Sequence, residues 1–148
     1  MKLGELLNSK DFKYRVLVTV RQDETVSVAI RSLVEYDRGS LPVVDDNGEL
    51  VGIITERDIV MKCVAYSKDC AKLKVREVMS KQVAVGIPED DLSYAISVMK
   101  QQRIRHLPII KNKSVIGMIS MRDLLGVQLE EYTAQVRILS DYISGRYG

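Results

Sequence analysis

The sequence predicts an α/β fold, an α+β sandwich made of two βαββα repeats that pack sheet to sheet with pseudo-twofold symmetry, plus a C-terminal helix. Three observations lead to this prediction. The phrase GIITERDIV at 52–60 returns as GMISMRDLL at 117–125. An amphipathic helix pattern precedes each copy, and two short apolar segments separated by a turn lie next to it. Neither repeat alone buries enough surface to be stable, so the two are expected to form one body.

The two copies align beyond this phrase. With an offset of 66, Leu41 and Pro42 meet Leu107 and Pro108, and after one deletion in a polar turn the offset becomes 65. Surface turns tolerate such changes, so the alignment indicates an internal duplication. We expect repeat 1 at residues 1–65, repeat 2 at residues 66–125 and a helical extension at residues 126–148.

Local patterns predict the same elements in both repeats. Apolar residues at i, i+3, i+4 and i+7 predict helices over 26–33 and 92–99, and acidic residues precede each, where the helix dipole favours them. A strand follows, LPVVD or LPIIK, with its proline near the start. A turn and a second strand, LVGIIT or VIGMIS, complete a hairpin, and Thr55 or Ser120 then begins another helix.

The C-terminal residues predict a helix of about 20 residues with a narrow apolar seam. The seam repeats at spacings of 4, 3, 4, 3 and 4 and consists of Leu125, Leu129, Tyr132, Val136, Leu139 and Ile143. Such a helix either packs back on its own body or contacts a partner. The regularity of the seam favours a homodimer contact.

Composition narrows the classes of function. The chain has 148 residues, 46% hydrophobic and 28% charged, with a net charge of +2, as expected of a globular domain. The basic residues are scattered, which argues against nucleic acid, and no apolar run approaches a membrane span. Cys63 and Cys70 are not spaced as zinc ligands, and the chain has one histidine, so we expect no metal site. We expect both cysteines to be inert. We expect a cytoplasmic protein.

The chain resembles a tandem pair of cystathionine-β-synthase (CBS) domains, a Bateman module. The resemblance is carried by LPVVDDNGELVGIITERDIV at 41–60, LPIIKNKSVIGMISMRDLL at 107–125 and the lead-in VREVMSKQVAV at 75–85. It covers residues 3 to 125. The lead-in of the first repeat is about six residues longer than its counterpart, which leaves the start of its first strand open.

The repeated hydroxyl-x-x-Asp phrase has two interpretations. Thr55 with Asp58, and Ser120 with Asp123, fit a capping box, a structural role at the start of a helix. The same helix start also offers free N–H groups to phosphate, and a carboxylate there can accept hydrogen bonds from ribose hydroxyls. The resemblance implies the second role, with an adenosine ligand gripped by this phrase.

The resemblance further implies two pockets that each draw on both repeats. Arg57 and Arg122 are expected to meet phosphate, and Pro42 and Pro108 complete the candidate set. The first pocket would hold Thr55 and Asp58 with Val83, Ala84, Val85, Arg105 and His106, and the second Ser120 and Asp123 with Thr19, Val20, Gly39 and Ser40. We expect the first pocket to be tighter, because the Arg105 guanidinium can hold phosphate through two hydrogen bonds.

The expected function is a regulatory module that binds an adenine nucleotide and acts through an unknown partner protein. AMP, ADP or ATP is favoured over S-adenosylmethionine, whose sulfonium is cationic and carries no phosphate. The alternative is a dimerisation or scaffold protein with vestigial pockets. The sequence has no nucleophile–base pair, metal cluster or Gly-rich phosphate loop, so neither catalytic residues nor a cofactor are expected.

Overall fold

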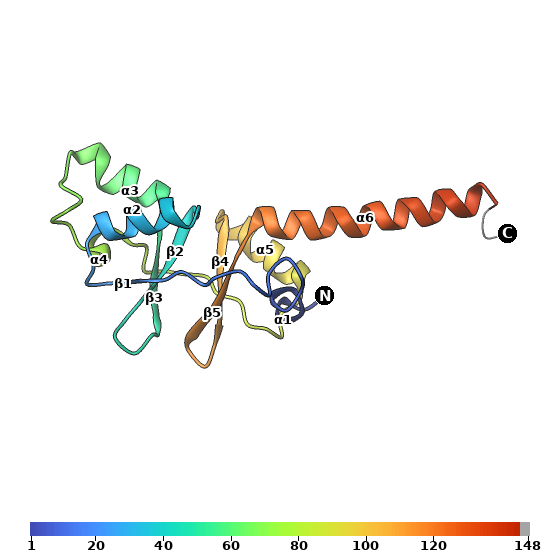
Figure 1. Cartoon of the computed structure of the whole chain (residues 1–148), viewed down its shortest axis with the longest axis horizontal. Helices are drawn as coiled ribbons and strands as arrows, with labels where there is room; N and C mark the ends of the chain where they lie inside the picture. The colour runs from blue at the N-terminus through green and yellow to red at the C-terminus, as the bar shows by residue number, and fades with distance from the viewer. Residues whose placement is uncertain (146–148) are drawn as a thin grey trace.

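The computed structural model describes residues 1–145 and places the two repeats side by side, with one long helix leaving them (Figure 1). The first half contains α1 (Leu3–Leu7), β1 (Val20–Arg21), α2 (Val26–Glu35), β2 (Ser40–Val44), β3 (Leu50–Thr55), α3 (Glu56–Lys62) and the 3-10 helix η1 (Val64–Tyr66). The second half contains α4 (Val75–Val78), α5 (Leu92–Gln102), β4 (His106–Lys111), β5 (Ser114–Ser120) and α6 (Met121–Ile143). The predicted fold class is confirmed.

Helices α2 and α5 each turn one apolar face to a sheet, as their spacing predicts. In α2 the buried residues are Val26, Ala29 and Leu33, and the helix begins where Thr25 accepts a hydrogen bond from the amide of Val28. In α5 the buried residues are Leu92, Ala95 and Met99. The two helices therefore cover equivalent positions of the two repeats.

The sheets follow the repeat but are not identical. Strand β2 pairs with β1 in parallel and with β3 in antiparallel orientation, whereas β4 pairs with β5 alone. The first strand of the second βαββα repeat is reduced to one parallel bridge, between Gly86 and Ile109. A bridge between Glu49 and Ser114 joins the tips of the two hairpins.

Each repeat completes its core with the lead-in that precedes the other repeat in the sequence. Leu3, Leu6 and Phe12, from the start of the chain, are buried in the core of the second repeat. Val75 and Val78, from the lead-in of the second repeat, are buried in the core of the first. Both cores therefore contain side chains from both sides of residue 65. The division of the chain into repeats at residue 65 stays a prediction.

This exchange explains the glycine in the repeated phrase. A Cβ at Gly52 would lie 2.7 Å from the Sδ of Met79, and one at Gly117 would lie 2.8 Å from a Cδ of Leu7. Met79 and Leu7 both belong to the exchanged lead-ins. At Gly52 the Cβ would also lie 2.8 Å from the backbone carbonyl of Ser80, so glycine is needed there, whereas at Gly117 a Cβ would displace the Leu7 side chain.

Helix α6 begins at its Ser120 cap and continues without a break, so the helix of the second repeat and the C-terminal helix are one element. It projects from the body (Figure 1), and its alternative placement, packed back on the repeats, is not found among the described residues. Leu124 is buried in the body, whereas every seam residue is between 47% and 77% exposed. Residues 146–148 of the expected extension lie outside the described residues.

We find no helix in residues 1–145 that is long and apolar enough to span a membrane.

Candidate functional site

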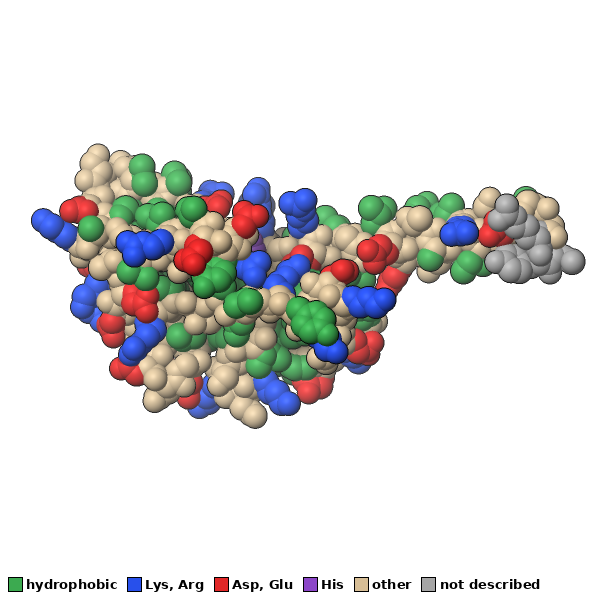
Figure 2. Space-filling model, in the orientation of Figure 1, with side chains coloured by type: hydrophobic (Ala, Val, Ile, Leu, Met, Phe, Trp, Pro, Cys, Tyr) green, Lys and Arg blue, Asp and Glu red, His purple; other side chains and the backbone are tan. Residues whose placement is uncertain are grey.

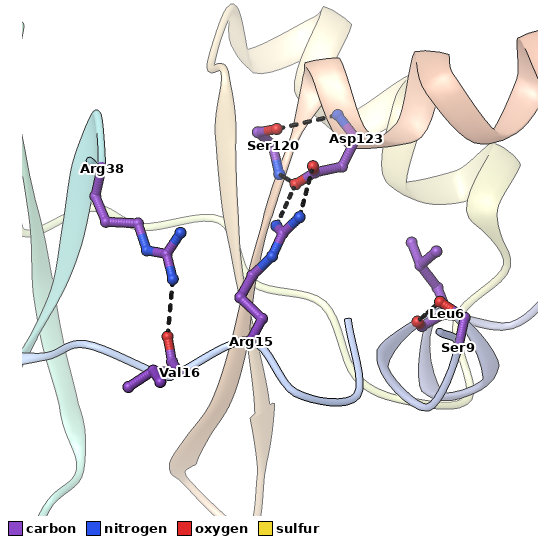
Figure 3. Close-up of polar contacts among 7 residues, drawn as sticks. All are labelled: Leu6, Ser9, Arg15, Val16, Arg38, Ser120 and Asp123. Atoms are coloured by element: carbon purple, nitrogen blue, oxygen red, sulfur yellow. Dashed lines mark hydrogen bonds and ion pairs between the residues drawn. The ribbon is translucent and has the colours of Figure 1, made fainter. Parts of the chain in front are cut away.

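A cleft of about 1000 Å³ lies where the two repeats meet. Its walls are the starts of β2 and β4, the end of β5, the first turn of α6 and the irregular segment 13–18, which we call the strap. The strap runs across the cleft and is tied to the first repeat, because Arg38 donates to the carbonyl of Val16 at 3.0 Å (Figure 3).

The side chains around the cleft are predominantly cationic. The acidic residues that line it are Asp37 and Asp123, and the basic ones are Lys13, Arg15, Arg38, Arg105, Lys111 and Arg122. Figure 2 shows blue Lys and Arg side chains gathered around the purple histidine at the base of α6. Concave surfaces lined by one sign of charge concentrate counter-ions, so the cleft suits an anionic ligand.

Asp123 lies at the rim of this cleft, at the start of α6. Its amide donates to the hydroxyl of Ser120 at 3.0 Å, and the amide of Ser120 donates to its carboxylate at 2.9 Å. The two residues thus form a capping box, as the structural interpretation predicts. Figure 3 shows Arg15 reaching the same carboxylate from the strap, with hydrogen bonds of 3.1 and 3.4 Å.

Two effects act on the pKa of Asp123. Burial alone would raise this pKa, but the hydrogen bonds from Ser120 and Arg15 outweigh burial and lower it below the ordinary value. The carboxylate is therefore ionised at neutral pH. It is an anion on a cationic wall, held by an arginine that stacks 4.0 Å from the ring centre of Phe12.

The matching carboxylate of the first repeat is already fully occupied. Asp58 and Thr55 form a second capping box, and Asp58 also accepts hydrogen bonds from the hydroxyls of Thr55 and Ser80 at 3.1 Å each. Lys62 lies 3.1 Å from it. Neither Asp58 nor Thr55 lines the cleft, and Arg57 lies outside it on an exposed part of α3.

The assignment of Arg105 and His106 to a pocket stays a prediction. Both line the cleft with Ser120 and Asp123, whereas Thr55 and Asp58 are not among its lining residues. The cause is local, because β4 and β5 form an antiparallel hairpin that pairs His106 with Ser120. The start of β4 and the end of β5 must therefore lie together.

Gly39 and Ser40 complete the cleft from the first repeat, as expected. Ser40 is 3% exposed, and its hydroxyl is the buried side-chain polar atom in residues 1–145 that has no hydrogen-bond partner. Leaving a buried hydroxyl unpaired costs about 1–3 kcal/mol. Ser40 is among the residues that line the cleft, and its hydroxyl has no partner within the described residues.

His106 lies against this part of the wall. A Cβ at Gly39 would come within 3.3 Å of its Nε2, so the ring packs closely against the glycine. Burial lowers the pKa of His106, against the opposing influence of Asp123 and Glu56, while Arg105 lowers it further. The ring is therefore neutral at neutral pH and can donate one hydrogen bond and accept another.

The structure brings only part of the remaining candidate set to the cleft. Pro42 and Arg122 line it, whereas Val20 is buried in the first core and Ala84 packs against the second. Val83 and Val85 line a separate cleft of about 260 Å³ beside the hairpin tips. Thr19 and Pro108 are not among the residues of either cleft.

Sequence reasoning missed the strap. Lys13, Arg15, Val16, Leu17 and Val18 all line the cleft. The one available signal was the longer lead-in of the first repeat, which leaves extra residues between α1 and β1. The apolar run at 16–18 suits a strand, and nothing in its pattern points to a site.

Comparison with known proteins agrees with this architecture. The family model of the CBS domain matches residues 10–64 and 75–130, once for each repeat. The chain belongs to the CBS-domain family. A pair of such domains is a regulatory ligand-binding module, and the CBS repeats here occupy most of the chain.

Individual CBS proteins resemble the chain over most of its length. The CBS domain-containing protein CBSX3, mitochondrial, from Arabidopsis thaliana is 34% identical over 129 residues, which are 84% of this chain and 63% of that protein. The chain therefore spans less than two thirds of that relative. A signal-transduction protein with CBS domains from Burkholderia ambifaria MC40-6 superposes with a TM-score of 0.80 at 30% identity, over 88% of this chain and 95% of the other.

A third protein shares the fold at lower identity. The CBS domain pair of protein MJ0100, solved in complex with 5′-methylthioadenosine and S-adenosyl-L-methionine, has a TM-score of 0.76 at 23% identity. The match covers 88% of this chain and 98% of that one.

Proposed function

We propose that the cleft binds an adenine nucleotide and that this CBS pair passes its occupancy to a partner protein. The observation that carries the proposal is the unpaired, buried hydroxyl of Ser40 in a wall with six basic residues. A ligand with several anionic oxygens satisfies both features, since it can accept from the hydroxyl and from the guanidinium groups.

Each part of a nucleotide has a matching surface. Phosphate suits Arg105, Arg122 and the first turn of α6, where the helix dipole favours anions. The base suits the apolar part of the wall, from Val16 and Leu17 on the strap to Ile116 and Met118 on β5.

The ribose suits Asp123, whose carboxylate can accept from two hydroxyls, but Arg15 occupies that carboxylate in this structure. Ligand binding would therefore move Arg15 from Asp123 toward the phosphate. The exchange favours a charged ligand over a neutral nucleoside, because only the former compensates the guanidinium for its lost ion pair.

One pocket, not two, is expected to bind with high affinity. The carboxylate of Asp58 already accepts from Thr55 and Ser80 and lies beside Lys62, so a ribose there would have to displace internal partners. This reverses the ranking expected from the sequence, in which the pocket of Thr55 and Asp58 was the tighter one. We place Arg105 and His106 with the single Asp123 site.

AMP, ADP and ATP are preferred over S-adenosylmethionine, because a sulfonium would add a cation to an already cationic wall. A regulatory rather than catalytic role, a cytoplasmic location and the unknown regulated protein stay proposals from the sequence. The alternative, a dimerisation or scaffold protein with vestigial pockets, predicts that none of these ligands binds.

The test is calorimetric titration of the full chain with AMP, ATP, adenosine and S-adenosylmethionine. Asp123→Asn and Asp58→Asn form a matched pair, since both residues cap a helix in the same way. Asp123→Asn is expected to weaken AMP at least tenfold, about 1.4 kcal/mol. Asp58→Asn is expected to leave the affinity within about threefold while lowering the Tm, because it disturbs a buried network.

Arg105→Ala separates phosphate from ribose recognition. It should weaken AMP more than adenosine, since only AMP carries the charge. Absence of heat with every adenine nucleotide favours the scaffold alternative. Loss of AMP binding in Asp58→Asn but not in Asp123→Asn would show that the first repeat holds the ligand after all.

We also propose that the protein is a homodimer joined through α6. The exposed seam needs a partner, because an isolated helix of this length is marginal in water. The positions flanking the seam hold uncharged residues, namely Gln128, Thr133, Gln135 and Ser140. Two copies of α6 could therefore approach without like charges meeting beside the seam.

A further inference from the structure

The two cysteines of the chain lie in direct contact with each other, and neither lines the cleft. Cys63 and Cys70 are both free thiols, and their Sγ atoms are 2.6 Å apart. Six residues separate them, and the 3-10 helix η1 turns the chain back between them, with Ser67 in the left-handed region at φ 54°. This turn of the backbone places the two sulfur atoms in contact.

Their surroundings differ, which gives the pair two distinct roles. Cys63 ends α3, is 0% exposed within the first core and donates to the carbonyl of Lys68. Cys70 is half-buried in the linker that connects the repeats. Burial, then the contact with Cys70, raises the pKa of Cys63 to about 11, so that thiol stays protonated and inert toward solvent. Cys70 is therefore the thiol that an oxidant meets first.

A metal site does not account for the pair. Within residues 1–145 no group of three or more His, Cys, Asp or Glu side chains is placed to hold a metal ion. Simple core packing explains Cys63, a small apolar residue, but not why the second sulfur is brought to it from the linker.

We propose that Cys63 and Cys70 are a redox-active dithiol that closes to a reversible intrachain disulfide. The oxidant is a peroxide. The Cys70 thiolate attacks one peroxide oxygen, the O–O bond breaks, and the leaving hydroxide takes a proton to become water, which leaves a sulfenic acid.

The second step uses the buried thiol. Its sulfur attacks the Cys70 sulfur, the S–S bond forms as the S–O bond breaks, and the departing hydroxide takes the Cys63 proton as a second water. Two thiols lose two electrons in all, and one peroxide is reduced to two waters. The proximity of the two sulfur atoms favours this step over further oxidation of Cys70. A small thiol can reverse the reaction by attack on the accessible Cys70 sulfur.

The disulfide would add a covalent bond between the end of α3 and the linker, which the reduced chain joins by hydrogen bonds and packing. Cys63 ends α3, while the carbonyl of Cys70 accepts from the amide of Ser27 in α2, and the linker also bonds α2 where Val26 donates to Leu73. At its other end α3 borders the cleft, because the amide of Glu56 donates to the carbonyl of Gly39. Oxidation therefore fixes the helix that supports one wall of the cleft.

The test is the intact mass of the reduced and then peroxide-treated full chain, with free thiols blocked by a maleimide under denaturing conditions. The reduced chain should take up two maleimides. The oxidised chain should take up none, weigh two hydrogens less at monomer mass and regain both thiols with dithiothreitol. Its Tm should be about 5 °C higher than that of the reduced chain, because the cross-link restricts the unfolded state.

Two variants serve as controls. Cys63→Ala should accumulate a Cys70 sulfenic acid that dimedone traps, and Cys70→Ala should stay unmodified while folded. Both variants should show the same Tm with and without peroxide. The proposal is overturned if the wild-type chain keeps two thiols under peroxide that modifies Cys63→Ala, if it forms only disulfides between chains, or if oxidation leaves the Tm unchanged. The wild-type measurement decides even where Cys63→Ala fails to fold.

Discussion

At the scale of single residues, the repeated phrase serves the fold in both copies, and we propose that it serves a ligand in one. Gly52 and Gly117 make room for a lead-in, and each Thr or Ser caps a helix together with its aspartate. The copies diverge in what else reaches the carboxylate. Asp58 is contacted by Ser80 and Lys62. Asp123 instead pairs with Arg15 and borders the cleft.

A pH dependence follows from His106. Its pKa is lowered from 6.5 by burial, so below about pH 6.5 the unfolded chain binds a proton that the folded chain resists. The free energy of unfolding should therefore fall as the pH drops from about 8 to about 5. His106→Gln should flatten that part of the profile in urea unfolding experiments.

The contribution of Asp123 belongs to a separate, more acidic range. Its pKa is lowered from 3.8, so its stabilisation is complete above that value and is lost as the pH falls through the pKa of the folded state. For the His106 prediction, the contradicting outcome is a His106→Gln variant whose free energy of unfolding varies between about pH 8 and about pH 5 as in the wild type, because another group would then titrate in that range.

At this scale the sequence was a partial guide to the site. It placed Gly39, Ser40, Ser120 and Asp123 in one pocket, and all four line the cleft, because the repeat marks where strands end and helices begin. It grouped Arg105 and His106 with Asp58, whereas the hairpin that pairs His106 with Ser120 brings both to the cleft beside Asp123. Charged residues on an irregular strap have no periodicity, so their position could come only from the folded chain.

At the scale of elements, α6 leaves its apolar seam exposed. Its first turn belongs to the second core through Leu124, and beyond it the seam residues are exposed along the projecting part (Figure 1). The seam was visible in the sequence as a heptad-like spacing. Whether it would fold back could not be read from the same spacing, because packing against a sheet and packing against a helix both use one apolar stripe.

Two substitutions test the helix contact. Leu139→Glu places a charge in the seam, whereas Ala134→Glu places the same charge on the exposed far side of the helix. Light scattering at high micromolar concentration should give twice the 16.7 kDa chain mass for the wild type and for Ala134→Glu. Leu139→Glu should weaken association at least tenfold, about 1.4 kcal/mol, because a buried charge without a partner is costly. A wild-type protein that is monomeric under these conditions contradicts the homodimer.

At the scale of the whole molecule, the exchanged lead-ins make the two repeats interdependent. The fold class was predictable because two copies of one pattern reinforce each other. The exchange of lead-ins was not predictable from the sequence. The apolar spacing of α1 and α4 shows that each helix has a buried face, but it does not show which repeat buries that face.

The exchange predicts that a substitution in one lead-in destabilises the repeat that is more distant in the sequence. Leu6→Ala should cost about 2–4 kcal/mol and speed hydrogen exchange in α5, β4 and β5, although Leu6 lies near the start of the chain. Val78→Ala is the reciprocal control and should speed exchange in α2 and β2 first. If Leu6→Ala instead loosens α2 while leaving α5 protected, the lead-in does not belong to the second core.

The exchanged lead-ins also have an evolutionary consequence. A one-repeat ancestor with this pattern could complete its core only by giving its lead-in to a second copy and receiving the other's in return. It would have been an obligate pair whose folding depended on concentration. Duplication and fusion placed both partners on one chain, so an encounter between two molecules became an intramolecular step. Only after that could the two copies of the phrase diverge, one settling into an internal network and the other remaining beside an open cleft.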